Sequence, residues 1–108
     1  MRRSVRVVGL GEVEVAAYGF NDAEHRVEKE ISELWPDAAV SITAVRRSDG
    51  PARIVDEFVV SYKLEAVLDT EEKSYDTALR EAFRRARSHF EGTRYRHLEL
   101  RAPTSKTD

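Results

Sequence analysis

The sequence has 108 residues, a formal net charge of −2 and no cysteine. Its length is that of one domain that can bury a core without covalent cross-links. The lack of cysteine excludes disulfides, thiolate metal sites and a cysteine nucleophile from this sequence. No apolar run is long enough to span a bilayer. The basic start, Met1 to Ser4, is followed by no apolar segment. We therefore expect a cytoplasmic protein with no signal peptide and no membrane partner.

The charges are unevenly distributed along the chain. Residues 1–10 carry a net +3, residues 11–37 carry −6, and residues 74–101 carry +3. This is not the pattern of a general polyanion binder, which is basic throughout. Local patches of both signs are instead compatible with self-association or with a charged protein partner.

Alternation predicts a first strand, with one face formed by Val5, Val7, Val13, Val15 and Ala17. Gly9 and Gly11 interrupt it, so we expect a bulge, a bend or a close approach of another segment there, or else a hairpin turn. An amphipathic helix follows. Asn21 or Asp22 is predicted to cap its start, and Pro36 is predicted to end it.

A second strand is predicted around residues 38–44 and a third over Ile54–Leu68, joined by the turn-like segment 46–51. Fifteen residues of strand span roughly 50 Å, which exceeds the diameter of a compact domain of about 100 residues. We therefore expect the third strand to bend or bulge near Asp56, or to project with its neighbour as a hairpin over residues 46–57.

Helical spacing then predicts a second helix with a core face formed by Tyr75, Ala78, Leu79, Ala82, Phe83, Ala86 and Phe90. Gly92 is predicted as its C-cap, residues 95–102 as the last strand, and residues 103–108 as a flexible tail. The order β-α-β-β-α-β predicts one ferredoxin-like α+β domain over residues 1–102. Its four-stranded antiparallel sheet would have the first and third strands at the centre and two helices on one face.

A sheet covered on one face leaves the other face open. Five apolar residues are predicted to form an oligomer interface there: Val8, Leu10, Val55, Val59 and Val67, with Tyr18 and Val45 as further candidates. Apolar side chains in excess on an open face are typical of an interaction surface. This pattern favours a homo-oligomer that associates through the open face or through the long hairpin.

A second interpretation rests on arginines. Arg80, Arg84 and Arg87 form one exposed stripe on the second helix, and Arg46 and Arg47 lie in the predicted hairpin. Such a stripe could contact a phosphate backbone. Nucleic acid is nevertheless not the favoured partner, because no aromatic residue interleaves the arginines for base stacking.

Other motifs are weak. The pair Gly9 and Gly11 lacks the third glycine and the helix of a dinucleotide fingerprint. The three histidines have no metal-ligand spacing on a shared element, although His97 would lie beside Glu99 on a strand, and His89 is predicted on the solvent flank of its helix. We therefore expect no cofactor and no metal, and we assign no catalytic residue.

The sequence thus favours a non-enzymatic binding or assembly module that works as a homo-oligomer. The first alternative is an RNA- or ribosome-associated protein that uses the arginine stripe. The second is a small dimeric α+β barrel enzyme with a pocket between its sheet and helices.

Overall fold

The computed structural model describes residues 2–51 and 53–103. It shows an α+β fold in which four antiparallel strands form one open sheet in the order β2-β3-β1-β4. The strands are β1 (Arg3–Ala17), β2 (Ala39–Arg47), β3 (Asp56–Thr70) and β4 (Glu99–Arg101), and the helices are α1 (Phe20–Leu34) and α2 (Tyr75–Ser88). The first and third strands are central, as predicted. The predicted tail beyond Pro103 lies outside the described residues.

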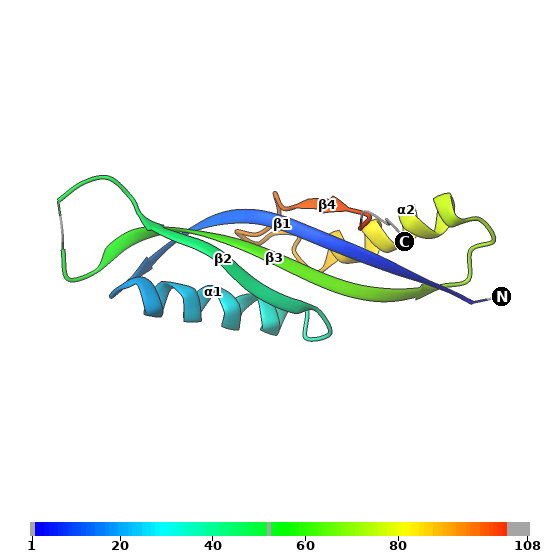
Figure 1. The fold of residues 1–108 in the computed structure, drawn as a ribbon, viewed down its shortest axis with the longest axis horizontal. Coiled ribbons are helices and arrows are strands. Elements are labelled where there is room, and N and C mark those ends of the chain that lie inside the picture. The colour runs from blue at the N-terminus through cyan, green and yellow to red at the C-terminus, as the bar shows by residue number, and fades with distance from the viewer. Residues whose placement is uncertain (1, 52, 104–108) are drawn as a thin grey trace.

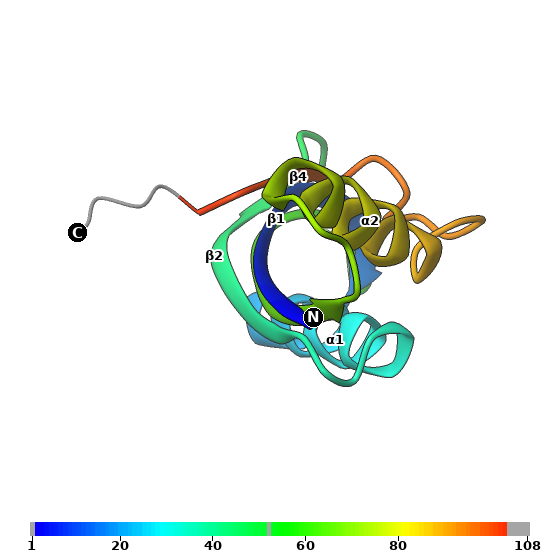
Figure 2. The ribbon, with the colours of Figure 1, turned by 90° about the vertical axis from the view of Figure 1, so that its right-hand side faces the viewer.

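The two central strands pair without interruption over fifteen residues, from Arg3 opposite Thr70 to Ala17 opposite Asp56. They run along the long axis of a molecule that measures 55 × 30 × 18 Å (Figure 1). The bulge predicted near Asp56 is absent from this pairing. The prediction assumed a compact domain, whereas this domain is elongated enough to hold the strands, and its sheet curls along their length (Figure 2). The third strand also begins and ends two residues later than the predicted range Ile54–Leu68.

The glycines of β1 make room for two large side chains of β3. The pairing runs through Gly9 and Gly11 without a shift, so neither the bulge nor the hairpin turn is present there. A Cβ on Gly9 would lie 2.8 Å from Leu64 Cδ1, and one on Gly11 would lie 2.5 Å from the Tyr62 hydroxyl oxygen. The close approach is therefore the correct alternative, since both of these partner side chains are fully buried.

Both helices lie against the same face of the curled sheet, α1 on β2, β1 and β3, and α2 on β1 and β3 (Figure 2). The residues of α2 that are buried against the sheet are alanines: Ala78, Ala82 and Ala86. Tyr75 is 47% exposed, and Leu79 and Phe83 are only half-buried at the edge of the core. Tyr75 is thus not the core residue that its spacing predicted, because α2 turns its small side chains toward the strands.

The start of α1 differs from the prediction. The helix begins at Phe20 after Gly19, which provides no side-chain cap. Asp22 lies inside the first turn, where its carboxylate accepts hydrogen bonds from the Tyr18 N–H at 3.0 Å and from Arg26 Nε at 2.9 Å. The end of the helix is as predicted, since Leu34 is its last residue and Pro36 follows closely.

The irregularity expected in β3 occurs in β2, where the pairing shifts between Ile42 and Ala44. The shift turns Val45 toward the core, opposite Val60, so Val45 does not join the open face. At the hairpin end the described residues that project beyond the sheet are 48–51 and 53–55 (Figure 1). The predicted arm over residues 46–57 is therefore too long, because β1 pairs with β3 as far as Asp56.

The last strand is much shorter than the predicted range 95–102. Turns cover the segment before it, and they bury Tyr95 and Leu98. Gly92 has a positive φ of 75°, as a C-cap glycine would, but α2 has already ended at Ser88 with His89 as its cap residue.

Substituting Gly11→Ala is expected to lower the free energy of unfolding by about 1 to 3 kcal/mol, since the new Cβ overlaps Tyr62. Urea denaturation of the variant measures this loss. In a Tyr62→Phe background the loss becomes smaller, because the hydroxyl is the atom that the Cβ meets first. An equal loss in both backgrounds would show that the contact is not its cause.

Candidate interaction surfaces

The face of the sheet opposite the helices carries alternate residues of each strand. Val8, Leu10, Val59 and Val67, four of the five predicted interface residues, lie on this open face. Val67 is 61% exposed and the other three are half-buried. Val55 is different, because it precedes β3 and lies in the hairpin loop.

A shallow hollow of about 280 Å³ lies at the centre of the open face. It is lined by Val8, Leu10, Lys63, Glu65, Arg101, Ala102 and Pro103. Side chains of opposite sign lie together around it: Glu65 is 3.6 Å from Arg6 and 3.8 Å from Lys63, and Glu99 is 3.1 Å from Arg101. The centre of the face is therefore apolar, and its border carries both signs of charge.

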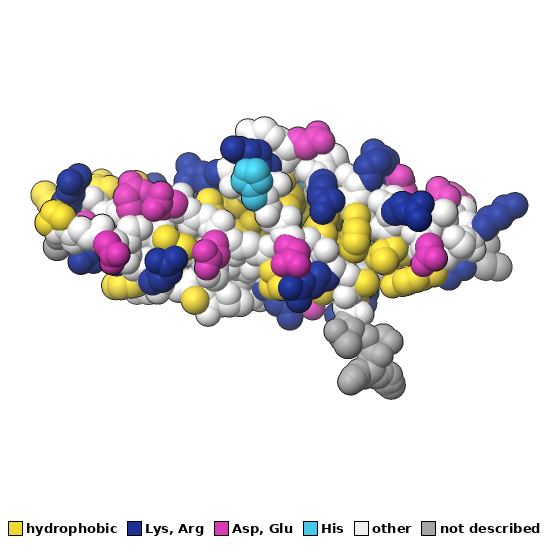
Figure 3. Space-filling view, turned by 90° about the horizontal axis from the view of Figure 1, so that it is seen from above, with side chains coloured by type: hydrophobic (Ala, Val, Ile, Leu, Met, Phe, Trp, Pro, Cys, Tyr) yellow, Lys and Arg dark blue, Asp and Glu magenta, His cyan; other side chains and the backbone are white. Residues whose placement is uncertain are grey.

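A second apolar surface lies at one end of the molecule. We call it the hairpin tip, and it comprises Tyr18 (69% exposed), Phe20 (55%), Ile54 (84%) and Val55 (44%). Its two segments meet because β1 ends at Ala17 opposite Asp56, so Tyr18 follows one strand and Val55 precedes the other. Hydrophobic side chains are visible at this end, on the left of Figure 3.

The sequence did not indicate the hairpin tip as one surface. Ile54 and Val55 fell within the predicted third strand, and Val55 and Tyr18 were predicted to lie on the open face of the sheet instead. The available signal was the presence of apolar residues in two connections that the antiparallel pairing brings to the same end. Phe20 is anchored there by Phe58, with ring centroids 5.1 Å apart.

The loop of the hairpin is held together by Asp56. Its carboxylate accepts a hydrogen bond from the Arg53 N–H at 2.9 Å and lies 3.8 Å from Arg47 Nη1. The Arg47 guanidinium also donates to the Gly50 carbonyl at 3.3 Å. This predicted polyanion-binding residue is therefore engaged within its own loop.

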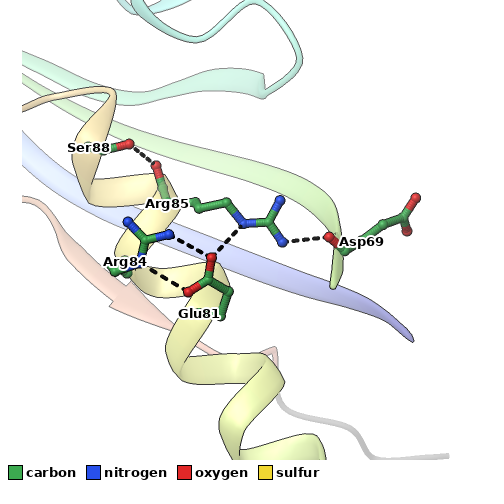
Figure 4. Close-up of polar contacts among 5 residues, drawn as sticks. All are labelled: Asp69, Glu81, Arg84, Arg85 and Ser88. Carbon is green, nitrogen blue, oxygen red and sulfur yellow. Dashed lines mark hydrogen bonds and ion pairs between the residues drawn. The ribbon is translucent and has the colours of Figure 1, made fainter. Parts of the chain in front are cut away.

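The arginine stripe of α2 is partly neutralised. The Arg84 guanidinium binds Glu81 through two hydrogen bonds of 3.0 and 2.6 Å (Figure 4). Arg85 lies 3.4 Å from the same carboxylate and donates to the Asp69 carbonyl, which ties α2 to the end of β3. Arg80 and Arg87 remain exposed on the helix.

The structure does not bring the two predicted groups of arginines together. Arg46 and Arg47 lie at the end of β2 next to the projecting loop, whereas α2 lies toward the opposite end of the long axis (Figure 1). A single nucleic-acid ligand would have to follow much of the 55 Å length to contact both groups.

Another hollow, of about 350 Å³, lies where the C-terminal end of α1 meets the turns before β4. It is lined by Glu30, Glu33, Leu34, Thr93, Arg94 and Tyr95. The Tyr95 hydroxyl donates a hydrogen bond of 2.5 Å to Glu30 Oε1, and its ring packs edge-on against Tyr62 at 5.6 Å. Burial raises the pKa of Tyr62 to about 12, and burial together with the Glu30 hydrogen bond raises the pKa of Tyr95 further. Both phenols therefore stay neutral at neutral pH, and they join the turns before β4 to the core.

The histidines do not form a site. His89 is half-buried rather than on a solvent flank: its ring stacks on Trp35 with centroids 4.7 Å apart, and Nδ1 lies 3.2 Å from the Leu34 carbonyl oxygen. His97 is exposed in the turns before β4 and is not on the strand that carries Glu99.

The described part of the chain contains no group of three side chains arranged to hold a metal ion. None of the described helices has the length and apolar character needed to cross a membrane.

Comparisons of the chain with protein-family models, with curated proteins and with solved structures found no match.

The buried tyrosines predict a loss of stability in alkali. Burial raises the pKa of Tyr62 to about 12 in the folded chain. The protonated phenol therefore contributes its full stabilisation of the folded state at pH values below the ordinary tyrosine pKa of about 10. The stability is lost as the pH rises from about 10 through 12. Tyr62→Phe is expected to flatten this decline, as followed by urea denaturation at a series of pH values. The same slope in the variant would assign the decline to other groups.

Proposed function

We propose that this chain is a non-enzymatic assembly module that works as a homo-oligomer, with the open face of the sheet as its interface. The observation that carries the proposal is the hollow at the centre of that face, which Val8 and Leu10 line and paired charges border. Apolar surface with a polar rim is typical of protein interfaces. Charges of both signs allow a second copy of the same surface to approach without strong net repulsion.

The proposal includes the finer fold assignment. The order of elements, together with β1 and β3 at the centre of the sheet, supports a ferredoxin-like domain. The absence of cysteine from the sequence supports a reducing compartment, and on that ground we propose a cytoplasmic location.

The alternatives have less support. For nucleic acid, the Glu81 carboxylate already binds Arg84, and the two groups of arginines lie apart. For an enzyme, the hollow beside Tyr95 offers a phenol whose proton is already donated to Glu30, and its lining residues include no histidine. The hairpin tip is the competing protein interface, and it can be separated from the open face by mutation.

Sedimentation of the wild-type chain at micromolar concentration is expected to show an oligomer. Leu10→Asp should dissociate it, because a carboxylate would have to be buried in the apolar centre of the interface. Ile54→Asp, which places the same side chain on the hairpin tip, is the matched control and should leave the oligomer intact.

A monomeric wild-type chain at all concentrations tested would contradict the proposal. Dissociation by Ile54→Asp but not by Leu10→Asp would move the interface to the hairpin tip. Circular dichroism of both variants confirms that each one is folded, since both substituted side chains lie outside the fully buried core.

A further inference from the structure

On the open face, the charges reverse sign across one point of β1, at equal distances from it. Gly9 points toward the helices, and the open-face residues around it are Arg6, Val8, Leu10 and Glu12. Val8 and Leu10 flank the glycine, a cation lies three residues before it, and an anion lies three residues after it.

Each neighbouring strand also carries one cation and one anion, on opposite sides of the residue that pairs with Gly9. Gly9 pairs with Leu64 of β3, which has Lys63 on one side and Glu65 on the other. Gly9 also pairs with Leu100 of β4, which has Glu99 and Arg101 on its two sides. A line across the sheet through Leu64, Gly9 and Leu100 therefore divides a cation from an anion on each of three strands.

We infer that the partner of the open face is a second copy of this chain, turned by 180° about that line and stacked face to face. The inference rests on the proposed self-association. The rotation reverses the strand direction, so position 6 of one copy lies over position 12 of the other. It matches Arg6 with Glu12, Lys63 with Glu65, Arg101 with Glu99 and Val8 with Leu10 of the second copy.

The other face-to-face arrangement is less favourable, because it places like charges together on β1. A rotation about an axis parallel to β1 would keep the strand direction and set Arg6 over Arg6 and Glu12 over Glu12. It would also set β3 over β4, which places Lys63 over Glu99 and Glu65 over Arg101. Like charges placed against each other in an interface are strongly repelled. Charge complementarity therefore favours the antiparallel arrangement of the two that place β1 over β1, since every charge in it meets an opposite charge.

The geometry of stacked sheets agrees with this choice. Packed sheets lie about 10 Å apart with their strands within roughly 30° of each other, so contact is best near the crossing point. The matched residues lie within three positions of that point, and the hollow lined by Val8 and Leu10 is there to receive an apolar side chain of the second copy.

The charges are free to form these contacts. The pairs that Arg6 and Lys63 make with Glu65 are on the surface, where such pairs contribute little. Glu12 accepts a hydrogen bond from the Ser61 hydroxyl at 3.3 Å and has no ion pair among the described residues.

Mixing two charge-reversed variants tests the arrangement. Arg6→Glu alone sets two carboxylates against each other at both ends of the interface, and Glu12→Arg alone does the same with two cations. Each variant by itself should bind its own kind at least about tenfold more weakly than the wild type. In a mixture both contacts become attractive, so the mixed dimer should dominate. Native mass spectrometry with one variant isotopically heavy counts the three species.

The matched control is Arg80→Glu on α2, which changes the same charge on the other side of the molecule and should mix with Glu12→Arg without preference. The Arg6→Glu and Glu12→Arg mixture would be attractive in the parallel arrangement too, so the pair Arg101→Glu and Glu99→Arg on β4 decides between the two. In the parallel arrangement Arg101 lies over Glu65 and Glu99 over Lys63, and these two variants would show no preference for each other. A wild-type dimer in which the β4 variants show no preference for each other would overturn the antiparallel arrangement and leave the proposed self-association standing. A monomeric wild type would overturn both.

Discussion

The uninterrupted pairing of β1 with β3 is the constraint on which the rest of the structure depends. It requires Gly9 and Gly11, because Leu64 and Tyr62 occupy the space in which Cβ atoms of β1 would lie. Fifteen paired residues make the sheet long, and the domain is correspondingly elongated. Large β3 side chains packed over glycine fill the middle of the covered face.

The same pairing sets the register of the open face. Because Gly9 lies level with Leu64 and with Leu100, the charges that alternate along three separate strands come into line across the sheet. The charge pattern is thus a property of the register and not of any one strand. The hairpin tip has the same origin, since it forms where the long pairing ends at Ala17 and Asp56.

Much of the fold was predictable because alternation and helical spacing are local signals. They identified the order of elements, the central strands and the end of α1 before Pro36. Local signals could not show which arc of α2 faces the sheet, since its alanines and its larger apolar residues have the same spacing. They also missed the shift in β2, and that one residue was enough to turn Val45 inward. The open-face positions of Val8, Leu10, Val59 and Val67 followed from alternation, but the hollow beside Val8 and Leu10 depends on side chains of three strands and on the segment after β4.

The central claim is that two copies stack antiparallel through their open faces, and distances between spin labels test it most directly. The chain has no cysteine, so Ser4→Cys and Glu14→Cys can each be labelled at one exposed position. In the antiparallel dimer, two labels at position 14 are ten residues apart along the strands, or about 33 Å. A label at position 4 of one copy and one at position 14 of the other should be much closer, within about 15 Å for sheets packed face to face. Short distances between two labels at position 14 would contradict the account.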